Sequence, residues 1–443
     1  MGKDSVVNTK PHDNIVEGIT TLKGGHSMRV YVINKRKEPL MPTKPQKARK
    51  LLESGKAKIV KREPFTIQLL QATGETKQKI TLGVDSGSKV IGLSATTGKK
   101  EVFASEVILR KDIVKLLATK RQNRRTKRNR LRYRKPRFSN RTKSKKKGWL
   151  APSIQHKIDT HLTVISKVCE ILPISKIIVE TASFDTQKLK NDKVEGYDYQ
   201  NGDQLGFWNV REYVLFRDHH KCQHCKGKSK DKILNVHHIE SRKTGGDSPS
   251  NLVTLCNTCH DDYHKGKIDL KIKRGKSYRD AVFMGIMRWS FYNQLKEIYL
   301  PVGIEIQNTY GYLTKSKRIE NNLPKEHCID AYCIAGNLEA KLLNNVLIQK
   351  KIRHHNRKIH KAKIQKGGKR KRNQSSYLVK GFRLFDKVNY KGQKCFITGR
   401  RATGYFALKT IDYTKVHNSA KSKELELVKA RGSFITQNIE RSR

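Results

Sequence analysis

Four cysteines near the middle of the chain are spaced as two CxxC pairs. They read Cys222-Gln-His-Cys225 and Cys256-Asn-Thr-Cys259. Four thiolates from two such pairs match a closed tetrahedral zinc site, which staples a segment too small to build its own core. The spacing therefore predicts a structural Zn²⁺ ion. The cysteines by themselves fit an inert zinc ribbon as well as a zinc-stapled enzyme domain.

Histidines in the same segment suggest a chemistry that a zinc ribbon does not need. His260 and His264 are four residues apart, so on a helix both imidazoles lie on one face. His237 and His238 are adjacent, so on a strand they point to opposite sides. One of these two can bind a second, open-coordination cation with His260 and His264 while the other faces a substrate. Phosphodiester hydrolysis requires such a cation beside a neutral imidazole, and the Asn251 amide can brace the intervening loop.

The segment resembles the HNH, or ββα-metal, endonuclease domain, including the paired CxxC motifs of its zinc-stapled branch. The resemblance implies a role for each of these residues. His238 would be the general base, and Asn251 would position the loop. His237, His260 and His264 would bind one Mg²⁺ ion.

Three acidic residues stand where apolar segments meet loops. Asp85 follows the run Ile80–Val84, Glu180 closes another apolar run, and Asp330 follows His327 by three residues at the start of an apolar helix. In this order they resemble the split active site of a RuvC-like nuclease with an RNase H fold. Three converging carboxylates repel one another unless they share cations, so two Mg²⁺ ions about 4 Å apart are expected there. His327 would then assist proton transfer.

The charge of the chain predicts a nucleic-acid partner. The 443 residues include 95 Lys and Arg against 39 Asp and Glu, a formal net charge of +56. Such an excess repels itself unless a polyanion neutralises it. No apolar run approaches the roughly 20 residues that cross a bilayer, and residues 1–27 lack the apolar core of a signal peptide. Because CxxC spacing fits metal binding in a reducing compartment, we expect an intracellular protein without membrane contact.

One stretch is far more basic than the rest. Lys120–Lys147 contains 16 Lys or Arg in 28 positions, and no acidic residue occurs between Ile113 and Ile158. A free helix with so many like charges would be strained. The stretch is therefore interpreted as an arginine-rich helix held by phosphates, with a disordered basic linker as the alternative.

The pattern of apolar residues predicts a multidomain α/β chain. Helices are predicted at Lys44–Ser54, His156–Leu172, Phe207–His219, Ala281–Leu300 and Cys328–Leu343. Strands are predicted at Val30–Ile33, Ala57–Val60, Phe65–Leu70, Lys79–Val84, Ile91–Thr96, Val102–Leu109, Lys176–Glu180, Ile304–Asn308, Phe382–Phe385, Cys395–Thr398 and Tyr405–Leu408. The short strands and Gly turns of the tail suggest a small β-barrel-like module.

The order of these pieces resembles the transposon-encoded IscB proteins, compact relatives of the large CRISPR DNA-targeting nucleases. Pro39-Leu-Met-Pro42 is the literal PLMP sequence for which their N-terminal domain is named. The fold class implied is a split RuvC-like core with an inserted HNH domain. The expected boundaries are a leader at 1–27, PLMP domain at 28–76, RuvC block one at 77–110, arginine-rich bridge helix at 111–150, RuvC block two at 151–204, HNH domain at 205–275, RuvC block three at 276–343, basic arm at 344–376 and C-terminal β-rich module at 377–443.

This resemblance implies an RNA-guided enzyme in a prokaryotic cytoplasm. Its guide would be a structured ωRNA, and one protein copy would act on double-stranded target DNA beside a short adjacent motif read with help from the C-terminal module. The HNH site would cut the guide-paired strand and the RuvC site the displaced strand. The arginines expected to bind RNA are Arg121, Arg124, Arg125, Arg128, Arg132 and Arg134.

Two other functions stay open on the sequence. A guide-independent HNH endonuclease would cut DNA without RNA and would read its target through side chains in the major groove. A non-catalytic, zinc-containing RNA-binding protein would use charge alone. In that protein the carboxylates and the histidines would be incidental.

Overall fold

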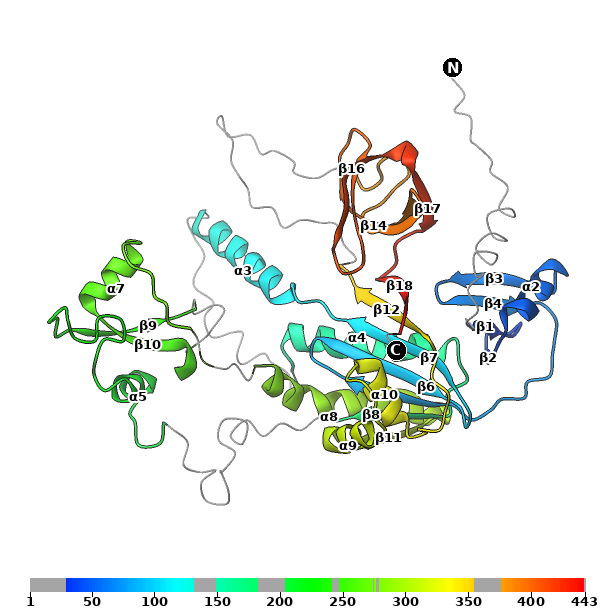
Figure 1. Ribbon diagram of the computed structural model, residues 1–443, viewed down its shortest axis with the longest axis horizontal. Helices are drawn as coiled ribbons and strands as arrows, with labels where there is room; N and C mark the ends of the chain where they lie inside the picture. The colour runs from blue at the N-terminus through cyan, green and yellow to red at the C-terminus, as the bar shows by residue number, and fades with distance from the viewer. Residues whose placement is uncertain are drawn as a thin grey trace. The chain divides into compact units, whose positions relative to one another are not determined.

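The computed structural model describes residues 29–130, 149–181, 204–240, 247–273, 275, 279–353 and 376–441. These residues belong to two units, and one interrupts the other in the sequence (Figure 1). The larger unit comprises Met1–Ala182 and Ile286–Arg443, and the inserted unit comprises Ser183–Gly285. The inserted unit contains both CxxC pairs.

A mixed seven-stranded sheet is the centre of the larger unit, in the order β11-β8-β5-β6-β7-β12-β18. Strands β5, β6 and β7 form an antiparallel meander, while β8 runs parallel to β5, and β11 runs parallel to β8. Leu82, Val84, Ile91 and Leu93 are fully buried, because two-sided burial suits the β-branched and apolar runs of these strands. The strands are β5 Thr81–Ser86, β6 Val90–Thr96, β7 Glu101–Ile108, β8 Lys176–Glu180, β11 Glu305–Thr309, β12 Asn345–Lys351 and β18 Phe434–Glu440.

Helix α10, His327–Ala335, packs directly on the backbone of this sheet. A Cβ atom on Gly83 would lie 2.0 Å from the Ala331 carbonyl oxygen, and one on Gly92 would lie 1.9 Å from that of His327. Only glycine allows this approach. The other helices of the unit are α3 Ile113–Arg130, α4 Pro152–Cys169, α9 Gly311–Glu320 and α8 Arg279–Tyr299, whose first residues belong to the inserted unit.

A small sheet precedes the large one in the sequence, in the order β2-β1-β4-β3. Its core is formed by buried apolar residues that include Val30, Val32, Ala48 and Ile67. The elements are β1 Val30–Ile33, β2 Pro39–Thr43, α2 Pro45–Glu53, β3 Ala57–Arg62 and β4 Phe65–Leu69. The PLMP sequence is strand β2.

The C-terminal module is a five-stranded antiparallel sheet in the order β16-β15-β14-β13-β17. Its core includes Val388, Ile397, Phe406 and Leu408. The strands are β13 Lys387–Tyr390, β14 Gln393–Arg400, β15 Tyr405–Lys409, β16 Lys415–Lys421 and β17 Leu425–Lys429.

A buried ion pair connects three parts of the larger unit. Glu63 of the N-terminal module pairs with Lys387 of the C-terminal module, and the side chain of Lys387 is only 5% exposed. The Glu63 carboxylate also accepts a hydrogen bond from Thr436 of β18, and Lys429 lies 3.6 Å away. Burial opposes ionisation of Glu63, but Lys387 and Thr436 outweigh it and lower the Glu63 pKa.

The inserted unit has a ββα core. The antiparallel strands β9 Leu234–His238 and β10 Leu252–Cys256 are followed by α7 Asn257–His264, and α5 Val210–Arg217 comes before them. Asp218 joins α5 to the hairpin, because its carboxylate accepts the Thr254 N–H at 2.8 Å and pairs with Arg217. Asn209 caps α5 by accepting the Glu212 N–H.

Most predicted elements are confirmed within a residue or two of their ends, but four predictions are wrong. The helix predicted at Cys328–Leu343 ends at Ala335, because Gly336 adopts φ +84° and stops it. Strand β12 begins at Asn345, inside the stretch assigned to a basic arm, and β18 joins the large sheet although it was assigned to the C-terminal module. Phe382–Phe385 is not a strand. Among the described residues, no helix is long and apolar enough to cross a membrane.

Candidate functional site

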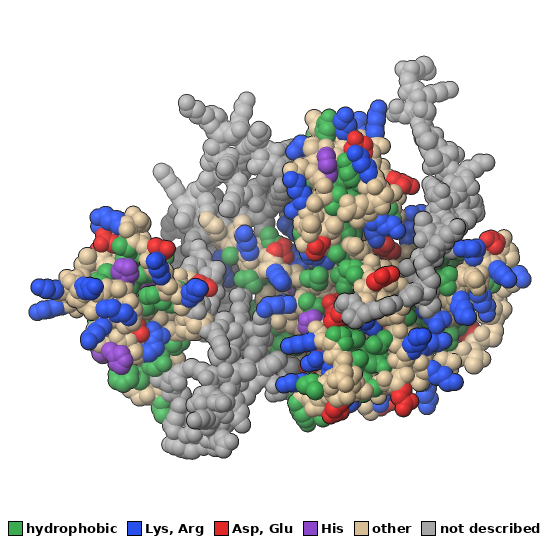
Figure 2. Space-filling model, in the orientation of Figure 1, with side chains coloured by type: hydrophobic (Ala, Val, Ile, Leu, Met, Phe, Trp, Pro, Cys, Tyr) green, Lys and Arg blue, Asp and Glu red, His purple; other side chains and the backbone are tan. Residues whose placement is uncertain are grey.

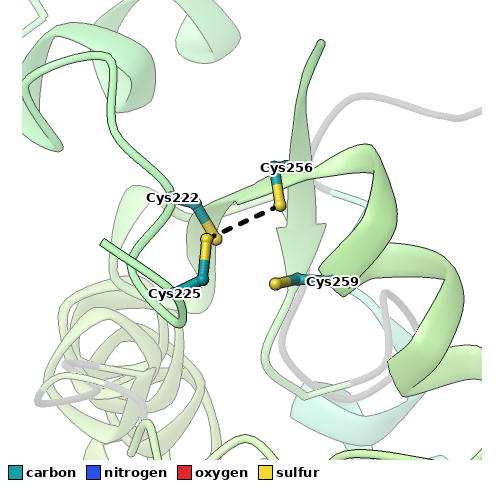
Figure 3. A group of neighbouring side chains, drawn as sticks. All are labelled: Cys222, Cys225, Cys256 and Cys259. Atoms are coloured by element: carbon teal, nitrogen blue, oxygen red, sulfur yellow. Dashed lines mark hydrogen bonds between the residues drawn. The ribbon is translucent and has the colours of Figure 1, made fainter. Parts of the chain in front are cut away.

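The four cysteines converge as the spacing predicts. Cys222 and Cys225 follow α5, Cys256 ends β10 and Cys259 lies in α7, and their sulfur atoms all lie within 4.8 Å of one another (Figure 3). Buried apolar side chains such as Leu255 pack around them, so the thiols form part of the core of this small unit. The geometry fits one structural zinc ion.

Ser229, which the sequence reasoning missed, lies beside this cluster. Its hydroxyl oxygen is 3.3 Å from the sulfur of Cys225 and 3.0 Å from that of Cys256. Burial works to raise the pKa of Cys225, but hydrogen bonds from Ser229 and nearby backbone amides lower it to about 5. A thiolate is the form that binds zinc, so the lowered pKa prepares Cys225 for that ion, whereas burial raises the pKa of Cys222 and of Cys259.

The structure also brings three histidines together. His237 of β9 and His260 and His264 of α7 each have a ring nitrogen within 4.8 Å of the others. Burial, with the neighbouring His260 and His264, lowers the pKa of His237 to about 4, so this ring is neutral at pH 7. Nε2 of His237 is buried and has no hydrogen-bond partner among the described residues. A cluster of three imidazoles, one of which has an orphaned buried nitrogen, fits a divalent cation.

His238 points away from these rings, as strand alternation predicts, and makes a contact that the sequence did not reveal. Its Nε2 atom lies 2.9 Å from Oδ1 of Asp247. An ionised Asp247 accepts a hydrogen bond from the Nε2–H group, which leaves Nδ1 of His238 as the basic nitrogen. In the sequence, only the adjacent Gly245 and Gly246 indicated a loop before Asp247.

Asn251 is fully buried at the end of a short 3₁₀ turn, Pro249–Asn251. Its Oδ1 atom accepts the Glu240 N–H at 2.8 Å, and its Nδ2 atom donates to the Glu240 carbonyl at 2.9 Å. These two bonds hold Glu240, two residues beyond His238, beside the turn. They are the contacts expected of a loop-bracing amide.

The predicted carboxylates lie near one another at one end of the strands of the large sheet, but among the described residues they do not form a ligand cluster as tight as those of the four cysteines and the three histidines. Val84 and Val179 are in register on the parallel strands β5 and β8, so Asp85 and Glu180 come next on each strand. Helix α10 brings His327 and Asp330 to the same edge, where Nδ1 of His327 donates to Oδ2 of Asp85 at 2.6 Å.

The shifted pKa values of the carboxylate site indicate that it can bind positive charge. Burial and the charges of Asp85 and Asp330 raise the pKa of Glu180 to about 7. Burial and Asp85 also raise the pKa of Asp330, while the hydrogen bond to Asp85 raises that of His327. Carboxylates that oppose one another's ionisation fit a site for divalent cations, which removes the repulsion.

Helix α9 supplies a wall of the carboxylate site that the sequence reasoning missed. Gly311, Thr314 and Arg318 follow the spacing of one helix face. A Cβ atom on Gly311 would lie 2.9 Å from Oε1 of Glu180. A hydrogen bond with Thr314 offsets part of the rise in the Glu180 pKa. Nε of Arg318 lies 3.0 Å from Oδ1 of Asp330. In the sequence, nothing in Gly311–Glu320 except this spacing indicated a contribution to the carboxylate site.

Glu106 fixes the start of α10 beside the site. Asp85, Gly92 and Glu106 are cross-strand neighbours on β5, β6 and β7. The Glu106 carboxylate accepts the Cys328 N–H at 3.2 Å, which satisfies one of the free donors at the helix start. Asp85 and Glu106 therefore hold the first turn of α10 from both sides.

The arginine-rich segment is described only in its first half. Helix α3 extends from Ile113 to Arg130, and Arg121 and Arg124 are exposed on it. Arg125 and Arg128 lie on the same helix with undescribed side chains, while Arg132 and Arg134 lie outside the described residues. Lys and Arg side chains are spread over the described surface in the face shown in Figure 2.

Two family models match the chain. The model described as RRXRR protein matches residues 30–202, and the model described as HNH endonuclease matches residues 222–266. No curated protein matches.

Cas9 enzymes are among the solved structures similar to this chain. Streptococcus thermophilus Cas9 in complex with the AGAA PAM is 13% identical with a TM-score of 0.28, over 43% of this chain and 26% of that one. The Type II-C Cas9 enzyme from Actinomyces naeslundii is 11% identical with a TM-score of 0.25, over 59% of this chain and 60% of that one. The chain thus covers less than two thirds of each enzyme. The HNH endonuclease match includes both cysteine pairs and the three clustered histidines.

Proposed function

We propose that this chain is a metal-dependent DNA endonuclease, an RNA-guided, two-site enzyme of the IscB type. The observation that carries the proposal is the presence of two chemically different centres in one chain. One is the histidine site of the inserted unit, and the other is the carboxylate site of the large sheet. The strand arrangement supports the RuvC-like identity of the second, because β7-β6-β5 form a meander that continues into the parallel strands β8 and β11.

At the histidine site, the guide-paired DNA strand would be cut. His237, His260 and His264 would hold the divalent cation, which supplies Lewis-acid stabilisation of phosphate charge when bound. Nδ1 of His238 would take a proton from water, since Asp247 fixes the other ring nitrogen as the donor.

At the carboxylate site, the displaced strand would be cut. Asp85, Glu180 and Asp330 would hold Mg²⁺, which supplies charge stabilisation at the scissile phosphate when bound. His327 is oriented by Asp85 through Nδ1, so its Nε2 atom would move the proton. Arg318 holds Asp330 from the side of α9.

Guide RNA would occupy the basic surface. The formal net charge of +56 needs a polyanion to neutralise it, and Arg121 and Arg124 are exposed on helix α3, where their guanidinium groups can bind phosphates. By the resemblance, the RNA is an ωRNA that pairs with the target strand, one protein copy acts per complex, and the C-terminal module helps to read the adjacent motif in a prokaryotic cytoplasm.

A guide-independent HNH endonuclease is the second candidate function. It is favoured by the inserted unit, which has its own core and contains both the zinc-type and the histidine clusters. A non-catalytic zinc protein is disfavoured, because the HNH endonuclease model matches this segment.

The test is to express the chain with its flanking genomic DNA and to sequence the RNA that co-purifies. The complex is then incubated with plasmids that differ only in a guide-matched target. A single long RNA and cutting of the matched plasmid alone would support the proposal. Cutting of both plasmids by RNA-free protein would favour the guide-independent enzyme.

A further inference from the structure

Two exposed tyrosines lie next to the carboxylate site, and no step described above uses them. Tyr310 and Tyr312 flank Gly311 at the start of α9. Their rings stack with centroids 6.1 Å apart and planes 11° apart. Tyr310 is 42% exposed and Tyr312 is 68% exposed, so the pair leaves aromatic surface open to solvent.

The fold fixes the backbone of both tyrosines close to the carboxylates. Thr309, the last residue of β11, is in register with Glu180 on the parallel strand β8, and its carbonyl accepts the Thr181 N–H at 2.9 Å. The backbone of Gly311 then lies against Glu180, because a Cβ atom there would be 2.9 Å from Oε1. Tyr310 and Tyr312 are the chain neighbours of Gly311, so the Cα atom of each lies about 4 Å from that of Gly311.

Charge around the rings suits a polyanion. The exposed face of α9 continues from Tyr312 to Lys315, one turn further on, and the first turn contains no acidic residue. An aromatic ring with a lysine one turn away matches what single-stranded nucleic acid offers, a flat base joined to a phosphate. Paired bases in a duplex have no free face for such a ring.

We infer that Tyr310 and Tyr312 form a stacking platform for an unpaired base of single-stranded DNA, which positions the neighbouring phosphodiester at Asp85, Glu180 and Asp330. The inference rests on the proposed function, because it assigns the platform to the strand that the carboxylate site cuts. Stacking is tolerant of sequence, since every base has a π face, so the platform would hold any displaced strand. The tyrosines are substrate-positioning residues and take no part in the chemistry.

Four variants of the full chain test the platform. Tyr310→Ala with Tyr312→Ala removes both rings, and Tyr310→Phe with Tyr312→Phe keeps the rings without the hydroxyls. Ile319→Ser is the matched control, because Ile319 is a 56% exposed apolar residue of the same helix. Asp85→Asn identifies the strand whose cut depends on the carboxylate site.

Two readouts keep the inference separate from the proposed function. The first is fluorescence of a single-stranded oligodeoxynucleotide with one 2-aminopurine, which is quenched when that base stacks, measured with Ca²⁺ in place of Mg²⁺. The second is the rate of the Asp85-dependent cut in the RNA complex. The double alanine variant is expected to lose the quenching and to slow that cut about tenfold or more, while the other strand is cut normally. The double phenylalanine variant and Ile319→Ser should behave as the unchanged protein.

Quenching and cutting that survive in the double alanine variant would overturn the platform and leave the proposed function standing. If Asp85→Asn removes neither cut, the proposed function fails, and the quenching still decides whether the rings bind a base. A loss of quenching that the double phenylalanine variant shares would also overturn the platform, because it would show hydrogen bonding by the hydroxyls instead of stacking.

Discussion

Replacing Gly311 by alanine should slow one of the two cuts without destabilising the fold. The added Cβ atom would lie 2.9 Å from Oε1 of Glu180, whereas ordinary contact begins at 3.4 Å. Glu180 has a flexible side chain, so its carboxylate gives way by about half an ångström at little cost. A misplacement of about 1 Å in a catalytic group can cost about a hundredfold in rate, so we expect a loss of about tenfold here.

The assay is strand-resolved cleavage of a target whose strands carry different 5′ labels. Gly311→Ala should slow only the strand whose cut is lost in Asp85→Asn. Its melting temperature should be unchanged or slightly higher, because alanine favours a helix over glycine by about 1 kcal/mol. Gly285→Ala is the matched control, since no atom lies within 4 Å of a Cβ atom there. An unaltered rate on the Asp85-dependent strand would refute the position or the role that we give to Glu180.

Three further predictions concern the metal sites and the connection between modules. Chelation of divalent metal by EDTA should abolish both cuts, while zinc stays bound to the four cysteines, as measured by mass spectrometry. Cutting that persists in EDTA would contradict the two proposed cation sites. Asp247→Asn should slow the His238-dependent cut about tenfold to hundredfold without changing the other cut, and equal loss on both strands would argue against the pair. Glu63→Gln should lower the free energy of unfolding by about 2–3 kcal/mol in urea at pH 7, because it leaves the buried Lys387 unpaired. Since the folded pKa of Glu63 is lowered, this contribution exists above its ordinary value of 4.5 and is lost as the pH falls, so the two proteins should converge in acid.

Local patterns were sufficient to predict most strands and the convergence of the cysteines. Short apolar runs bounded by Gly or polar residues predicted β5, β6, β7 and β8, because burial on both faces leaves a direct trace in the sequence. The alternation of His237 and His238 followed from strand geometry alone. The approach of Asp85 and Glu180 could be expected from resemblance, but their register depends on pairing between distant strands.

Contacts between distant segments were not predictable. Asp247 beside His238, Ser229 beside the thiols and Arg318 on Asp330 depend on how loops and helices pack, and no local pattern encodes them. The return of β18 to the large sheet is of the same kind, because its partner β12 lies far away in the sequence. The predicted helix Cys328–Leu343 was wrong for a different reason. Gly336 is a local signal for the end of a helix, but the prediction gave more weight to the apolar residues that follow it.

The central claim is that this chain has two independent nuclease sites, and one measurement tests it most directly. Asp85→Asn and His238→Ala are each assembled with RNA and given a guide-matched target with differently labelled strands. The account predicts that Asp85→Asn spares the guide-paired strand and loses the displaced strand, and that His238→Ala does the reverse. Loss of both cuts in either variant, or of neither cut in Asp85→Asn, would contradict it.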